Sequence, residues 1–248
     1  MKIEIGCVVF TLLMVILTLG CEYFVITRES EPTGGKTRAF TYAMWGIGVF
    51  KGLASLGFLT FFYVITQEAY AVRSHDVEQQ VIWWALIASA VGDLLLVSER
   101  ESFFLSGLIA FFIAHIAYAV AFIHPLIAVD VSLSIPIVVS IIIGVGLMST
   151  VAYRSFHEDI PKSLTIPSIA YTSVIAIMVI CAAVHTIYLE CLTIMLGAVA
   201  FWLSDLAVAK QRFHGHKLLY KGFYVRLWGL PLYYVAQLLM ASEVIGLY

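Results

Sequence analysis

Long apolar stretches alternate with short polar connections along the whole chain. A helix needs about 20 mostly apolar residues to cross the hydrocarbon core of a bilayer, and eight stretches approach or exceed that length. No linker or low-complexity tract divides them, so we expect a single all-α domain over residues 1–248, a polytopic membrane helical bundle. The predicted spans are 5–26, 40–66, 81–97, 103–123, 134–153, 165–185, 189–209 and 222–247. No small-residue cleavage site follows the first stretch, which we therefore expect to be retained as a helix.

The composition points to the same class. Hydrophobic residues make up 62% of the chain and charged residues 12%, whereas soluble domains average about 45–50% and about 25%. The net charge is −2, so there is no basic field for binding nucleic acid. These values exclude a soluble enzyme, a disordered tail and a nucleic-acid binder. The four cysteines form no CxxC pair and predict neither a zinc site nor a redox motif, and nothing local specifies a disulfide between Cys181 and Cys191.

The basic residues of the connections predict an orientation. Ten Lys and Arg residues lie in the connections 27–39, 98–102, 154–164 and 210–221, against two on the opposite side. Because cytoplasmic loops carry the excess of positive charge, we expect these four connections in the cytosol and both termini outside it. The host membrane is then the endoplasmic reticulum or another endomembrane in a eukaryote, and the inner membrane in a bacterium.

Ionisable residues inside the predicted spans are the candidate functional groups. A charged side chain at the bilayer centre costs at least about 2.5–3.5 kcal/mol, so each one needs a reason to be there. Asp93 and Asp205 lie about one turn from the cytosolic ends of their spans, and Lys51 and Arg226 lie in two further spans. We expect these two acids and two bases to converge in the inner half of the bundle. Other polar candidates within the spans are His115, Tyr118, Tyr233, Tyr234 and Gln237.

Three classes of role fit such residues: catalysis, coupling of transport, or structural ion pairing. A transporter that uses Asp93 and Asp205 as coupling groups is the main alternative to an enzyme, because their separation of 112 residues suits a weak parallel repeat. An intramembrane aspartyl protease is disfavoured, since Ala90 stands where its motif has glycine. His214 and His216 favour a solvated loop over a metal site. We expect no metal.

Four short motifs resemble the YhhN-type family of eight-span membrane proteins, which includes the lysoplasmalogenases. The motifs are VGDLLL at 91–96, HIAYAVAF at 115–122, SDLAVA at 204–209 and YYVAQLL at 233–239. The two family aspartates fall on Asp93 and Asp205, and Lys51 matches a lysine of the second span. Lysoplasmalogenases hydrolyse the vinyl-ether bond of 1-alkenyl lysophospholipids to a fatty aldehyde and a glycerophospho-alcohol.

The resemblance implies acid–base catalysis by two aspartates without a cofactor. One aspartic acid would protonate the vinyl ether, while the other carboxylate would stabilise the cation and activate water. Arg226 is the expected partner of the phosphate, and Lys51 the expected partner of a carboxylate. His115, Tyr118, Tyr234 and Gln237 complete the predicted substrate-binding set. The expected partners are a lysophospholipid and the bilayer, with the oligomeric state left open.

Overall fold

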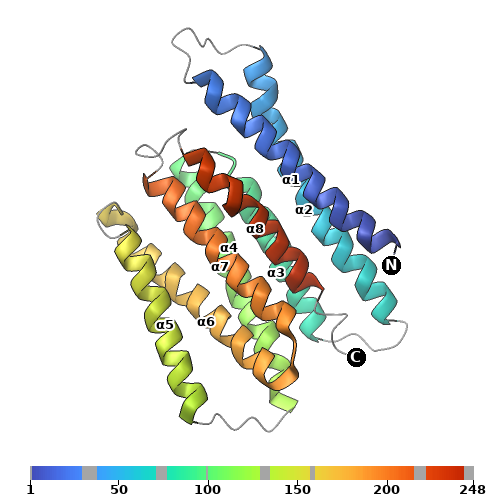
Figure 1. Ribbon diagram of the computed structural model, residues 1–248, viewed down its shortest axis with the longest axis vertical. Coiled ribbons are helices and arrows are strands. Elements are labelled where there is room, and N and C mark those ends of the chain that lie inside the picture. The colour runs from blue at the N-terminus through green and yellow to red at the C-terminus, as the bar shows by residue number, and fades with distance from the viewer. Residues whose placement is uncertain are drawn as a thin grey trace.

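The structure is a computed structural model that describes residues 2–29, 38–70, 77–98, 100–128, 135–156, 160–214 and 222–242. It contains eight α-helices in the described ranges and two short 3₁₀ segments, η1 (His124–Ala128) and η2 (Lys162–Leu164) (Figure 1). The α-helices are α1 (Lys2–Glu29), α2 (Arg38–Tyr70), α3 (Val77–Leu95), α4 (Glu101–Ile123), α5 (Ile135–Phe156), α6 (Thr165–Leu189), α7 (Leu192–His214) and α8 (Phe223–Ala241). The predicted all-α class and its eight helices are confirmed.

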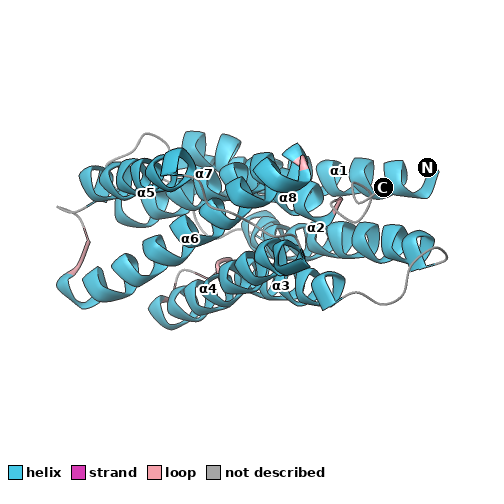
Figure 2. Cartoon of the chain, turned by 90° about the horizontal axis from the view of Figure 1, so that it is seen from below, coloured by secondary structure: helices cyan, strands magenta, loops and turns pink. Residues whose placement is uncertain are grey.

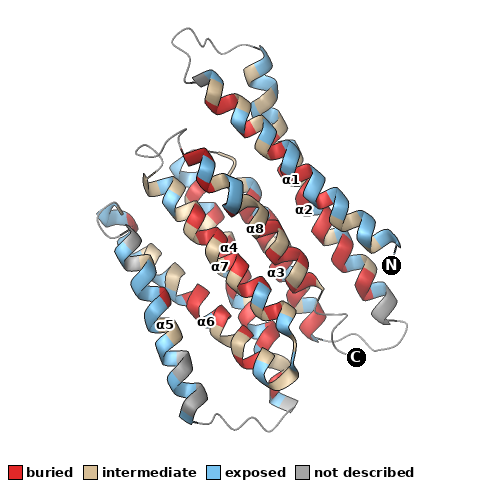
Figure 3. Cartoon of the chain, viewed as in Figure 1, coloured by how far each residue is buried: buried red, intermediate tan, exposed pale blue. Residues whose placement is uncertain are grey.

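Within the described residues, five helical segments are long and apolar enough to cross a membrane: Lys2–Arg28, Arg38–Gln67, Glu101–Ile127, Lys162–Leu189 and Leu192–His214. These segments carry large exposed apolar side chains such as Ile16, Trp45 and Ile169. Exposed positions run along the outer helices of the bundle (Figure 3). Water would disfavour so much apolar surface, whereas lipid accepts it, and a helix satisfies its own backbone hydrogen bonds there. The chain is therefore a membrane-embedded helical bundle.

The helices form two layers, with α1, α5, α7 and α8 in one and α2, α3, α4 and α6 in the other (Figure 2). The antiparallel hairpin of α1 and α2 packs beside α8 at one side of the bundle, and α5 and α6 flank α7 at the other (Figure 1). Helices α3, α4, α7 and α8 occupy the centre. The bundle core thus lies where the helices that carry Asp93, His115, Asp205 and Tyr234 meet.

Glycines allow the close approach of α3 and α4. A Cβ atom added at Gly107 would lie 3.2 Å from the carbonyl oxygen of Gly92, and one at Gly92 would lie 2.8 Å from the Phe111 ring. In lipid, where water does not drive helices together, such small residues let backbones pack tightly. This contact places Asp93, the neighbour of Gly92, close to Phe111.

The helix ends differ in places from the predicted spans. Helix α7 continues to His214, past the predicted end at 209, so Asp205 lies nine residues before the helix end while Asp93 lies two residues before the end of α3. The expectation that both lie about one turn from their ends therefore holds for Asp93 only. A short turn at 96–98 follows α3, and α4 begins at Glu101, so the connection is as short as expected. All four cysteines are free. Residues 243–247 of the eighth predicted span lie outside the described residues.

Candidate active site

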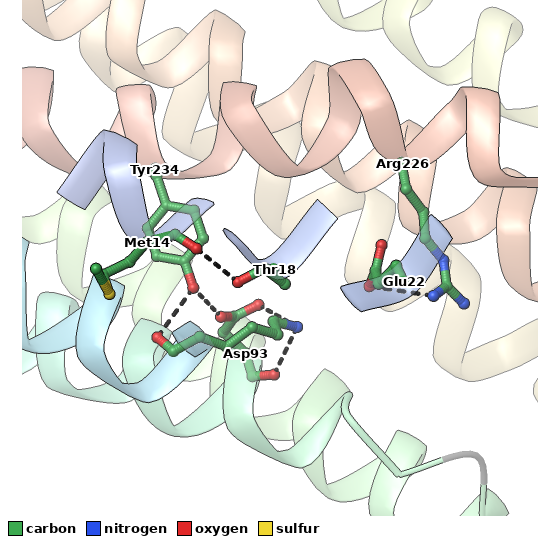
Figure 4. A network of polar contacts seen from close by, with 7 residues as sticks. Met14, Thr18, Glu22, Asp93, Arg226 and Tyr234 are labelled. Atoms are coloured by element: carbon green, nitrogen blue, oxygen red, sulfur yellow. Dashed lines mark hydrogen bonds and ion pairs between the residues drawn. The ribbon is translucent and has the colours of Figure 1, made fainter. Parts of the chain in front are cut away.

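Asp93 is held by side chains from two other helices, and we call Lys51, Asp93 and Tyr234 the Asp93 cluster. The Lys51 ammonium on α2 lies 2.7 Å from Asp93 Oδ1 and donates to the Asp93 carbonyl oxygen at 3.0 Å. The Tyr234 hydroxyl on α8 donates to Asp93 Oδ2 at 2.6 Å (Figure 4). All three residues are buried. Since both carboxyl oxygens face donors and one donor is a cation, this arrangement suits an ionised carboxylate.

Asp205 has a different set of partners, and we call His115, Tyr171 and Asp205 the Asp205 cluster. His115 Nε2 on α4 lies 3.1 Å from Asp205 Oδ2 on α7, and Tyr171 on α6 interacts with the Asp205 side chain beside the same cavity. His115 Nδ1 lies 2.6 Å from the Phe111 carbonyl oxygen, and its ring stacks on Phe201 at a centroid distance of 4.4 Å. Three helices thus fix the Asp205 cluster.

His115 is oriented so that its ring can pass a proton to the Asp205 side chain. A carbonyl oxygen only accepts, so Nδ1 must carry a hydrogen; this tautomer is assigned from the acceptor. Nε2 then faces Asp205 Oδ2 at 3.1 Å, and neither of these two buried atoms has a hydrogen-bond partner in the described structure. One proton placed on either atom would join them, so the pair is suited to hold a proton and to transfer it.

An aromatic wall of Phe111, Phe201 and Tyr233 lies between the two clusters. Tyr233 is 5.8 Å from each of the two phenylalanine rings and 4.8 Å from the Tyr234 ring, measured between centroids. Within the described residues, no hydrogen bond or ion pair joins the carboxyls of Asp93 and Asp205. The two aspartates thus occupy two neighbouring polar clusters, each with its own partners.

An apolar cavity of about 530 Å³ opens beside the Asp205 cluster, between α4, α5, α6 and α7. Asp205 is the only charged residue among those that line it, and exposed residues such as Ile169 and Ser173 mark its opening. Ligand pockets in proteins span about 300–1,000 Å³, so the space suits a small lipid. The lining also includes Leu96, Phe104, Phe111, Leu164, Tyr171 and Phe213.

Arg226 lies apart from both aspartates. Its guanidinium pairs with Glu22 on α1 at 3.1 Å and is partly exposed, at 26% of the side chain (Figure 4). The structure therefore brings Lys51 to Asp93 as expected, but it places Arg226 beside a third acid. Of the two acids and two bases that were expected to converge, only Lys51 and Asp93 form a pair. The charge of Glu22 explains this, because it offers Arg226 a nearer partner than either aspartate.

Tyr118 and Gln237 bond to each other. The Tyr118 hydroxyl donates to Gln237 Oε1 at 2.7 Å, and both side chains are fully buried. Neither is among the residues that line the cavity beside Asp205. Their predicted role in binding substrate therefore stays a prediction, while their contact fixes α8 against α4.

Two functional candidates were missed by the sequence analysis. Tyr171 was one polar group in a long apolar span, and only the fold shows that it faces Asp205. Glu22 lies near the end of the first predicted span, where a side chain can reach water, yet it is only 6% exposed. Among the described residues, no group of three His, Cys, Asp or Glu residues is placed to hold a metal ion. His214 ends α7, and His216 lies outside the described residues.

A sequence model described as the YhhN family matches residues 46–244 of this chain. The matched region begins within α2 and continues through α8, and it therefore includes both clusters. No solved structure shows a significant match to the chain. The family match thus covers most of the chain, including every residue that contacts Asp93 or Asp205.

Proposed function

Because the chain belongs to the YhhN family, we propose that it is a membrane lysoplasmalogenase, which hydrolyses the vinyl-ether bond of 1-alkenyl lysophospholipids. The products are a fatty aldehyde and a glycerophospho-alcohol such as glycerophosphoethanolamine or glycerophosphocholine. One observation carries the proposal: the His115–Asp205 pair, whose facing nitrogen and oxygen atoms lie 3.1 Å apart, lies at an apolar cavity of about 530 Å³. The reaction needs this combination, an acid beside an apolar chain.

The first step is proton transfer to carbon. The proton between Nε2 and Oδ2 moves to the β-carbon of the vinyl ether, and the electron pair of the double bond forms the new C–H bond. This leaves an oxocarbenium ion on the substrate, a neutral His115 and an ionised Asp205. The new carboxylate then faces the cation and stabilises it in a site with little water. A positioned acid of this kind contributes about 10²–10⁴-fold in rate.

The second step restores the pair. Water adds to the oxygen-bearing carbon of the cation and gives up one proton, which the His115–Asp205 pair takes back. The hemiacetal then moves its hydroxyl proton to the departing glycerol oxygen as the C–O bond breaks. One water is consumed, and the pair ends in the protonation state in which it began. The same pair therefore serves as acid and then as base.

The Asp93 cluster is assigned a positioning role in this proposal. Its ion pair joins α2 to α3, and the Tyr234 hydroxyl joins α8 to both, which fixes α8, the helix that supplies Tyr233 to the aromatic wall. Both Asp93 oxygens face donors, whereas Asp205 Oδ2 has no hydrogen-bond partner in the described structure, so Asp205 is better suited to accept a proton from water. The sequence predicted that both aspartates take part in the chemistry, whereas this proposal assigns the proton transfers to the His115–Asp205 pair.

We propose that the substrate enters from the cytosolic leaflet. The cavity is lined by Leu96, Phe104, Leu164 and Phe213, which lie where α3, α4, α6 and α7 meet three of the four basic connections. Single cysteines at Arg100 and Lys162 should react with a membrane-impermeant thiol reagent only after the cytosolic face is opened. Labelling of either site from outside intact cells would contradict this orientation.

The test is aldehyde release by the purified protein in detergent, measured by mass spectrometry. Lysoplasmenyl-ethanolamine is the substrate, and a monoacyl lysophosphatidylethanolamine of equal chain length is the control. We expect aldehyde from the first lipid only, and in D₂O we expect one deuterium on the carbon next to the aldehyde. Absence of aldehyde from folded protein, together with movement of the lipid across sealed liposomes, would contradict the enzyme and favour a transporter.

A further inference from the structure

We propose that Arg212 binds the phosphate of the lysophospholipid at the mouth of the cavity while the vinyl ether lies at Asp205. The choice of substrate class rests on the proposed function, and the placement of the anion site rests on the structure. Arg212 lies in the last turn of α7, where the sequence pattern had counted it as part of a basic connection.

The position of Arg212 on α7 aligns it with Asp205. The two residues are seven apart, which puts them on one face of the helix, two turns or about 10.5 Å apart along its axis. The Arg212 guanidinium lies 4.5 Å from the centroid of the Phe104 ring, and Phe104 lines the cavity. Phe213, the next residue on α7, lines it as well. Arg212 therefore lies at the end of the space that begins at Asp205.

The depth of Arg212 suits a phosphate. Helix α7 is apolar and long enough to span a bilayer, so its last turn lies at the level of the lipid headgroups. Asp205 lies two turns deeper, among apolar side chains. The substrate has the same arrangement along its length. Its phosphate lies at the headgroup level, where Arg212 is, and its vinyl ether lies deeper, beyond the glycerol backbone, where Asp205 is. One molecule can then contact both residues while its chain occupies the cavity.

The chemistry of arginine fits this role better than a lysine would. Its planar guanidinium can donate two parallel hydrogen bonds to a phosphate while its face stays on an aromatic ring. The ring of Phe104 thus limits the orientations of the guanidinium before the ligand arrives. Arg226, the candidate favoured by the sequence, pairs with Glu22 on α1 instead.

The test uses a ligand that cannot be cleaved. A saturated 1-O-alkyl lysophosphatidylethanolamine has no vinyl ether to protonate, so its dissociation constant is measured by calorimetry on the full chain in detergent. Arg212→Gln should weaken binding by about 10–100-fold, since a hydrogen bond to a charged group is lost. Arg212→Lys should recover part of this. Lys210→Gln is the matched control, because it removes an exposed cation from another face of α7 and should change nothing.

Two further ligands define what is bound. A 1-O-alkylglycerol lacks the phosphate and should bind the wild type and Arg212→Gln equally. Inorganic phosphate should compete only at concentrations far above the lipid's dissociation constant, since it lacks the chain. Wild-type affinity of Arg212→Gln for the phospholipid would overturn the proposal, and so would an equal loss for alkylglycerol, which indicates a damaged cavity. Tight binding of phosphate alone would assign the site to a free anion and overturn the lipid assignment.

These outcomes separate the two proposals. Binding that depends on Arg212 without any aldehyde release supports the phosphate site and contradicts the hydrolase. Aldehyde release with the same KM for Arg212→Gln and wild type supports the hydrolase and contradicts the phosphate site. For the active enzyme we expect Arg212→Gln to raise KM while kcat stays nearly unchanged, because uniform binding is lost.

Discussion

The Asp93 and Asp205 clusters are built from the same kinds of parts. Each has a buried aspartate on a central helix, a nitrogen base from a second helix and a tyrosine hydroxyl from a third. They differ in the base, which is lysine at Asp93 and histidine at Asp205, and in their surroundings. Only Asp205 lines the cavity. Histidine exchanges its proton near neutral pH, whereas lysine keeps its own, so the same carboxyl is suited to structure in one cluster and to proton transfer in the other.

The two clusters should also differ in how much stability is lost when one charge is removed. In a buried ion pair, removal of one partner leaves a charge without compensation, at a cost of about 3–5 kcal/mol, while replacement of both partners is often neutral. The Asp93 cluster should behave in this way. The His115–Asp205 pair can become neutral by moving one proton, so loss of the Asp205 charge should disturb the fold much less. Stability and activity should therefore respond in opposite ways at the two aspartates.

The largest expected effect on activity is that of Asp205→Asn. The amide can still donate to His115 Nε2, so the helices stay in place, but the proton for the vinyl ether is gone. We expect aldehyde release to fall by about 10³-fold, within the range of general acid–base catalysis. The measurement is the initial rate with lysoplasmenyl-ethanolamine, and thermal unfolding in detergent is the control. A rate within tenfold of the wild type would exclude Asp205 as the acid.

The next largest effect is on stability, at Asp93. Asp93→Asn leaves the Lys51 ammonium buried without its counter-charge and should lower the free energy of unfolding by about 3–5 kcal/mol. The double variant Lys51→Met with Asp93→Leu removes both charges and should recover most of that loss. Denaturant-induced unfolding in detergent is the measurement. If Asp93→Asn is as stable as the wild type, the ion pair does not support the bundle.

A smaller effect is expected at His115. Glutamine can hydrogen-bond Asp205 but cannot share a titrating proton with it, so His115→Gln should lower kcat by about 10²-fold. A structural role alone would lower activity without moving the pH profile of kcat, whereas the pair as acid and base requires that the profile change. An unchanged pH profile would therefore assign His115 to packing.

The smallest effect is expected at Tyr171. Tyr171→Phe removes the hydroxyl that interacts with Asp205 and keeps the ring that packs edge-on against His115 at 5.5 Å. A loss of about 0.5–1.5 kcal/mol corresponds to a rate lower by about 2–10-fold. Tyr234→Phe at the Asp93 cluster is the matched variant, and we expect it to change stability more than rate. The reverse result would exchange the roles assigned to the two clusters.

The fold was predictable because the bilayer imposes it. Apolar stretches of near-span length fixed the number and order of the helices, and the polar residues Asp93, Asp205 and Lys51 stood out by their cost in lipid. Opposite charge predicted that Lys51 would pair with a carboxylate, and the structure shows that this carboxylate is Asp93. These inferences need only hydropathy and charge, which a single sequence contains.

The partners of Asp205 were not predictable in the same way. His115 was a candidate, but its contact with Asp205 depends on how α4 and α7 rotate about their axes, and the hydropathy of these two spans does not determine that rotation. The partner of Arg226 was not predictable either, because Glu22 lies in the first span, far from Arg226 in the sequence. The cavity also depends on the packing of α5 against α6 and α7, which spacing along the chain does not show.

The central claim is that Asp205, and not Asp93, supplies the proton. The most direct test compares aldehyde release per folded molecule for two variants, Asp205→Asn and the charge-free pair Lys51→Met with Asp93→Leu. Our account predicts that the folded double variant keeps activity within about tenfold of the wild type, while the equally folded Asp205→Asn loses about 10³-fold. A folded double variant without activity, beside an active Asp205→Asn, would contradict it and return the chemistry to Asp93.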